Sequence, residues 1–68
     1  MVNILYCFDK NYNLQAFTSM ISLLDHSEDI INLHIIHKDV MTIEDFPKII
    51  INHKNLNKLT INTFDLKY

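Results

Sequence analysis

The feature that most constrains this fold is a hydrophobic pattern whose period alternates along the chain between that of a strand and that of a helix. A short apolar run lies at residues 3–8, and residues alternate between two faces at 30–37 and 58–64. Apolar residues in the intervening segments recur three or four positions apart. This order predicts strand, helix, strand, helix, strand. Each connection is long enough to hold a helix, so we expect an α/β domain with a three-stranded parallel sheet in βαβαβ order.

Two segments carry the helical spacing. The first follows a polar turn at residues 9–13, and Asn13 is a plausible N-cap for it. The second opens with Thr42 to Asp45, which has the form of a capping box, and Pro47 lies close to its start, where a missing N–H does least harm. We expect these helices to bury the following residues: Leu14, Phe17, Ile21 and Leu24 in the first, and Phe46, Ile49, Ile50 and His53 in the second.

The strands differ in how their two faces are composed. The first run is almost wholly apolar, which predicts a strand buried on both faces. In the second strand, Leu33 and Ile35 point one way while Asn32 and His34 point the other. Right-handed crossovers that step in one direction place both helices on the same face of the sheet. We therefore expect helices on one side and a partly bare sheet face on the other.

Composition excludes several functional classes. With 68 residues the chain has room for one small domain, which we place at 1–68. It contains no Gly, so it has no Gly-built phosphate loop, and its one Cys excludes an internal disulfide or a multi-Cys zinc site. A net charge of −2 argues against nucleic acid as a partner, and no apolar stretch is long enough to span a membrane. The free thiol favours a reducing, cytoplasmic location.

The segment most informative about function is the turn after the first strand. Ligands of open α/β sheets bind outside the carboxyl ends of the strands, which is where this turn lies. Asp9 and Asn11 could form hydrogen bonds with a base or sugar, and Tyr12 could stack on a ring. The alternative, which spacing alone favours, is a polar turn whose side chains only cap the next helix.

Three segments together resemble the start of a family 8 glycosyltransferase: NILYCFDKNY at 3–12, SMISLL at 19–24 and INLHII at 31–36. The resemblance covers nearly the whole chain and implies the first half of a GT-A sheet that binds a UDP-sugar. It implies that Cys7 offers backbone groups near the base, that Asp9 and Asn11 contact the nucleoside, and that Tyr12 stacks on uracil. The sequence departs from the family's pattern at Phe8 and Lys10.

The resemblance also identifies what this sequence does not contain. Relatives carry an Asp-x-Asp motif beyond the third strand, which binds manganese or magnesium and the diphosphate, and residues 1–68 contain no such motif. A leaving diphosphate then has no charge partner, so we expect no catalysis by this chain alone, no catalytic residue and no cofactor in it. The resemblance implies that the chain is the nucleotide-binding N-terminal portion of a larger glycosyltransferase domain, and weak binding of UDP or a UDP-sugar.

An alternative is a non-enzymatic α/β interaction module. An apolar first strand left at the sheet edge, beside a partly bare face, favours a homo-oligomer or a partner protein. The four histidines do not share a spacing typical of a metal site, since His34 and His37 lie on opposite faces of one strand. Cys7 is expected to be an inert core thiol in the buried first strand.

Overall fold

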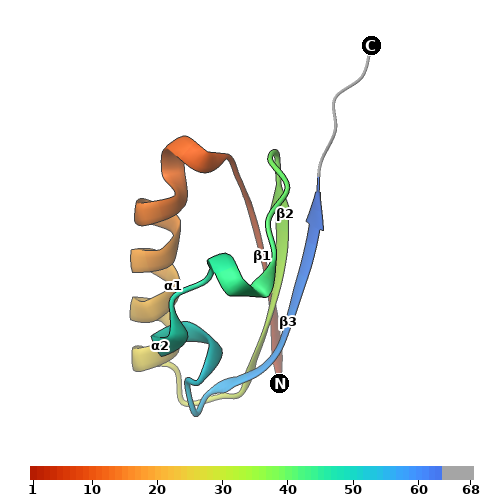
Figure 1. The fold of residues 1–68 in the computed structure, drawn as a ribbon. Coiled ribbons are helices and arrows are strands. Elements are labelled where there is room, and N and C mark those ends of the chain that lie inside the picture. Colours follow the sequence, from red (N-terminus) through yellow and green to blue (C-terminus); the bar gives the residue numbers. More distant parts are fainter. Residues whose placement is uncertain (64–68) are drawn as a thin grey trace.

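The computed structural model describes residues 1–63, which form a three-stranded parallel sheet in the order β1-β2-β3 (Figure 1). The elements are β1 (Val2–Phe8), η1 (Lys10–Tyr12), α1 (Asn13–His26), β2 (Ile31–His37), η2 (Ile43–Asp45), α2 (Lys48–Ile51) and β3 (Leu56–Thr63). The α/β class and the parallel sheet predicted from the hydrophobic period are therefore confirmed. The end of the strand predicted at 58–64 lies outside the described residues.

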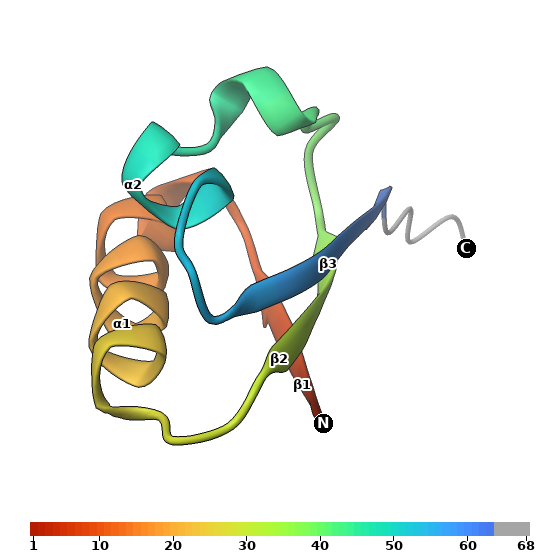
Figure 2. The same ribbon diagram turned by 90° about the horizontal axis from the view of Figure 1, so that it is seen from below.

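The core lies between the central strand β2 and the helices. Alternate residues of β2 are buried, and α1 and α2 appear on the same side of the sheet in both views (Figures 1 and 2). One cluster joins these elements, and its buried members are Ala16, Met20, Leu24, Ile31, Leu33, Ile35, Met41, Phe46 and Ile50. Burial of this apolar surface is the main contribution to the stability of the fold.

The prediction that the first strand is buried on both faces is wrong. None of the residues of β1 is fully buried, and Asn3, Leu5 and Cys7 are exposed. The reason is position rather than composition: β1 pairs only with β2 among residues 1–63, and the helices cover one of its faces. Cys7 is accordingly an exposed free thiol and not part of the core.

The second helix is much shorter than its apolar spacing suggested. The predicted capping interaction is present, since the Thr42 N–H donates to the Asp45 carboxylate at 2.8 Å, but it caps the single turn of η2. Pro47 then precedes α2, which ends after four residues. The chain continues into β3 through a turn in which His53 Nε2 lies 2.8 Å from a carboxylate oxygen of Asp25 at the end of α1.

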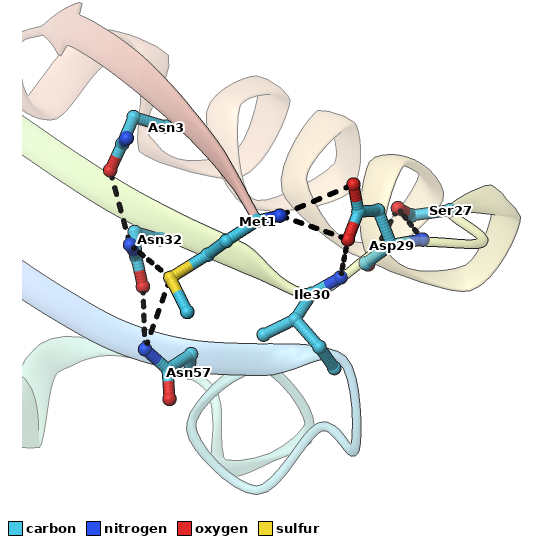
Figure 3. Close-up of polar contacts among 7 residues, drawn as sticks. All are labelled: Met1, Asn3, Ser27, Asp29, Ile30, Asn32 and Asn57. Carbon is cyan, nitrogen blue, oxygen red and sulfur yellow. Dashed lines mark hydrogen bonds and ion pairs between the residues drawn. The ribbon is translucent and has the colours of Figure 1, made fainter.

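The sheet face opposite the helices, hereafter the open face, is stabilised by amide groups near the amino ends of the strands (Figure 3). Asn32 donates to the side-chain oxygen of Asn3 at 3.1 Å and accepts from Asn57 at 2.9 Å. His34 Nε2 lies 3.0 Å from the same Asn3 oxygen. These cross-strand hydrogen bonds satisfy the polar side chains of a face that no helix of residues 1–63 covers.

In the part of the chain that the structure describes, no helix combines the length and the apolar character that crossing a membrane requires.

Candidate functional site

The carboxyl ends of β1 and β2 border a cavity of about 760 Å³. It is lined by Tyr6, Cys7, Phe8, Asp9, Tyr12, Gln15, Ala16, Ile36 and Lys38. The lining therefore comes from the last part of β1, the turn after it, the first turn of α1 and the end of β2. Sites for small ligands in proteins typically measure roughly 300–1,000 Å³, so this cavity has the size of a ligand site.

The turn after β1 is built by its own side chains. A carboxylate oxygen of Asp9 accepts the Asn11 N–H at 2.9 Å, and the Asp9 carbonyl accepts the Tyr12 N–H at 3.0 Å. Asp9 is thus the N-cap of η1, and one of its carboxylate oxygens makes the capping hydrogen bond. The prediction that this side chain caps the turn is confirmed for that oxygen. The other oxygen has no hydrogen-bond partner among residues 1–63. The side chain can therefore cap the turn and accept from a ligand at once.

A second, smaller cavity of about 240 Å³ adjoins the first. It shares Asp9 and Lys38 with the larger cavity and adds Lys10, Asn11 and Asp39. The Lys10 N–H donates to the Asp39 carboxylate at 3.2 Å, which ties the turn after β1 to the turn after β2. Two lysines and two aspartates thus surround a polar hollow beside a mainly apolar one.

His37 links the turn after β2 to the start of α1. His37 is 1% exposed, its Nε2 lies 2.8 Å from Asn13 Oδ1, and its Nδ1 lies 2.9 Å from the Asp39 carbonyl oxygen. The Asp39 N–H donates to that Nδ1 at 3.1 Å. Asn13, predicted as a cap, is the first residue of α1 and holds this histidine instead.

Phe8, where the sequence departs from the resembled family, has a structural role in the same region. Its ring meets His37 edge to face at 4.8 Å between centroids and Phe17 at 6.2 Å. Aromatic pairs in this geometry stabilise a core beyond the area they bury. Phe8 therefore fixes the position of the histidine that holds the neighbouring turns.

The structure brings three of the four sequence-predicted site residues, Cys7, Asp9 and Tyr12, to one cavity. Asn11 lines the adjacent cavity. The Tyr12 ring is 59% exposed, which leaves a face available for stacking. Their role in nucleotide binding stays a prediction, since the structure shows their placement and not a ligand.

Sequence reasoning missed the contributions of α1 and β2 to the site. Gln15 and Lys38 line the larger cavity, and His37 positions the surrounding turns. The signal that could have found Lys38 was present: parallel strands end at the same edge of a sheet, so the residue after β2 must lie near the residue after β1. No comparable signal identified Gln15, because its orientation depends on how α1 packs.

The described residues do not offer a metal centre. Within residues 1–63, no group of three His, Cys, Asp or Glu side chains converges closely enough to hold an ion. Asp9 and Asp39 both line the smaller cavity, but each already accepts a backbone N–H. The manganese or magnesium implied by the resemblance therefore has no ligand set in this part of the chain, and no chemical step is derived through it.

Comparison with known proteins finds that no protein-family model, curated protein or solved structure matches the chain.

Proposed function

We propose that the cavity at the carboxyl end of β1 binds the nucleoside portion of UDP or of a UDP-sugar. The observation that carries this proposal is that one cavity of about 760 Å³ brings together Cys7, Asp9 and Tyr12, at the strand ends where α/β sheets bind ligands. The resemblance of residues 3–12 to family 8 glycosyltransferases supports uridine as the base.

Each residue has a role that its surroundings allow. The exposed face of Tyr12 stacks on uracil, and the unpaired carboxylate oxygen of Asp9 accepts a hydrogen bond from the base or ribose. The neighbouring hollow offers Lys10 and Lys38 as contacts for a diphosphate, beside the carboxylates of Asp9 and Asp39. We expect weak binding, because few contacts from the strand ends, the turn after β1 and the first turn of α1 offset the cost of immobilising the ligand.

The proposed activity is binding and not glycosyl transfer. Transfer from a UDP-sugar requires charge stabilisation of the leaving diphosphate, and residues 1–63 assemble no metal ligands for it. We place the chain in the family as a nucleotide-binding portion whose catalytic groups would have to come from elsewhere. We place the chain in the reducing cytoplasm, where an exposed free thiol such as that of Cys7 stays reduced.

Titration of the ¹⁵N-labelled chain with UDP, followed by amide chemical shifts, tests this proposal. We expect the amides of residues 7–12 to shift at millimolar UDP, and to shift much less with ADP. Tyr12→Ala should weaken binding by about tenfold, while Tyr12→Phe, which keeps a ring for stacking, should bind like the parent. Unchanged shifts in residues 7–12 at millimolar UDP would show that the segment is only a turn.

Asp9 needs a variant that separates its two roles. Asp9→Asn keeps an oxygen that can accept the Asn11 N–H but removes the carboxylate charge, whereas Asp9→Ala also removes the cap of η1. We expect both to weaken UDP binding and only Asp9→Ala to lower stability. Equal UDP affinity for Asp9→Asn and the parent would contradict a direct contact between this carboxylate and the nucleoside.

The second candidate function is a non-enzymatic interaction module. It is favoured by the exposed strand β1, which carries Leu5 and Cys7 on the open face and has no partner strand on its outer side among residues 1–63. The two candidates differ in the UDP titration, which should leave a pure interaction module unchanged.

A further inference from the structure

We infer that the outer edge of β1 pairs with the same edge of a second copy of the chain, antiparallel and centred on Leu5. The inference names the partner for the interaction module and does not depend on nucleotide binding. The Val2 N–H donates to the Ile30 carbonyl at 2.9 Å, and the Phe8 carbonyl accepts the Lys38 N–H at 3.1 Å.

The even-numbered residues of β1 therefore direct their backbone groups toward β2. Successive residues of a strand point these groups to opposite edges, so Asn3, Leu5 and Cys7 direct theirs outward. No strand in the described range 1–63 takes up these donors and acceptors. A row of unpaired N–H and C=O groups is a template for another strand.

This edge also lacks the features that usually prevent such pairing. Residues 2–8 contain no charged side chain and no proline, and the register with β2 runs without a bulge. The side chain at the centre, Leu5, is 61% exposed. The edge is thus flat, uncharged and apolar at its middle.

The pattern of outward residues fits a second copy because it is symmetric about Leu5. When two such strands run antiparallel with Leu5 opposite Leu5, Asn3 of each lies opposite Cys7 of the other, and all outward backbone groups are paired. If the pairing register shifted by two residues, either Asn3 or Cys7 would lie opposite Asp9 or Met1, which are outside the partner's β1. An interface in which each copy uses the same patch is the geometry of a two-fold dimer.

Charges at the ends of the strand complement this orientation. Asp29 lies at the amino end of β1, where it accepts the Ile30 N–H at 2.8 Å and pairs with the amino group of Met1 at 3.2 Å (Figure 3). Lys10 lies just after the carboxyl end of β1. Antiparallel pairing brings Lys10 of each copy to the end of the interface that carries Asp29 of the other. The same register sets Met1 of each copy opposite Asp9 of the other, so each end of the interface joins the amino group and Asp29 of one copy to Asp9 and Lys10 of the other.

Light scattering after size exclusion, over a dilution series, tests the dimer. The key variant is Leu5→Lys, which sets two like charges opposite each other at the centre of the interface. Its matched control is Leu14→Lys, which changes a leucine of α1 that is 76% exposed. We expect the parent and the control to dimerise alike, and Leu5→Lys to dimerise about tenfold or more weakly. A parent that is monomeric at every concentration, or equal loss in both variants, would overturn the inference.

Disulfide trapping tests the register. In a chain carrying Cys7→Ser and Leu5→Cys, the two introduced thiols face each other across the two-fold axis, at a Cα separation of about 5.5 Å that a disulfide can bridge. Oxidation with diamide should then convert this variant to a covalent dimer on a non-reducing gel. A control that carries Cys7→Ser and Asn62→Cys, with the thiol at an exposed position of β3, should stay monomeric. Equal cross-linking of both would contradict pairing through β1.

These tests are separable from the UDP titration, because Leu5 does not line either cavity. UDP-induced shifts in a strictly monomeric chain would overturn the dimer alone.

Discussion

Strands β1 and β2 are of equal length, yet alternate residues of β2 are buried in the core and no residue of β1 is fully buried. Leu33, on the helix-covered face of β2, is 0% exposed, and its partner Ile4 in β1 is only partly buried. Leu5, one position further along β1, lies on the open face and is 61% exposed. β2 has a neighbour on each edge and helices on one face, while β1 has one neighbour. Burial in this small sheet is therefore decided by the strand order and by the face on which a side chain lies, as much as by hydrophobicity.

The largest effect is expected from truncating a leucine on the covered face of β2, compared with truncating one on the open face of β1. Leu33→Ala leaves a cavity in the core and should lower the free energy of unfolding by about 2–5 kcal/mol, a large share of the stability of so small a domain. Leu5→Ala, at an exposed position, should change it by about 0.5 kcal/mol or less. Urea unfolding followed by circular dichroism measures both, at a concentration where any dimer has dissociated. Similar losses in the two variants would contradict the difference between the covered face of β2 and the open face of β1.

The two histidines of β2 give the next largest contrast, because they lie on opposite faces. His37→Ala removes a buried ring and leaves Asn13 Oδ1 without its partner, which should cost about 1–3 kcal/mol. His34→Ala removes one hydrogen bond to Asn3 on the open face and should cost about 0.5–1 kcal/mol. The same urea titrations apply. A larger loss for His34→Ala would show that the open face is more ordered than its exposure suggests.

A smaller effect is expected within the open face itself. Asn32→Ala breaks two cross-strand amide hydrogen bonds, to Asn3 and from Asn57, and should cost about 1 kcal/mol. Asn62→Ala, on the same face but exposed, serves as the matched control and should be nearly neutral. Thermal unfolding of the two variants checks this, and equal melting temperatures would mean that the amide ladder adds nothing to stability.

The smallest effect concerns the exposed turn before β2. The Ile30 N–H and the amino group of Met1 hold the pKa of the Asp29 carboxyl below its ordinary value of 3.8. Because the folded-state pKa is the lower one, this stabilisation is present above the unfolded value and is lost as the pH falls through the folded value. The urea midpoint of Asp29→Asn should therefore fall less on acidification than that of the parent. Glu28→Gln is the control, and parallel pH profiles for the parent and Asp29→Asn would contradict the interaction.

The elements that sequence reasoning predicted well are those that depend on local pattern. The alternating period predicted the α/β class and the parallel sheet, and alternation in β2 placed His34 and His37 on opposite faces. The turn at 9–12 was correctly placed at the end of a strand, and the cap by Asp9 follows from the ordinary behaviour of Asp in turns.

The elements that could not be predicted depend on tertiary position. An apolar run such as residues 3–8 is compatible with an edge or a central strand, and only the strand order distinguishes them. The length of α2 depends on competition between its few apolar contacts and the turn that leads to β3. Gln15 and Lys38 join the candidate site through packing and register, which residue types alone do not reveal.

Amide hydrogen exchange along β1 tests the difference between the paired and the unpaired edge most directly. We expect the N–H groups of Ile4 and Tyr6, which face β2, to exchange slowly at every protein concentration. Those of Leu5 and Cys7, which face outward, should exchange rapidly in dilute solution and slowly where the dimer forms. Uniform protection along β1 that does not change with concentration would contradict both the open edge and its pairing with a second copy.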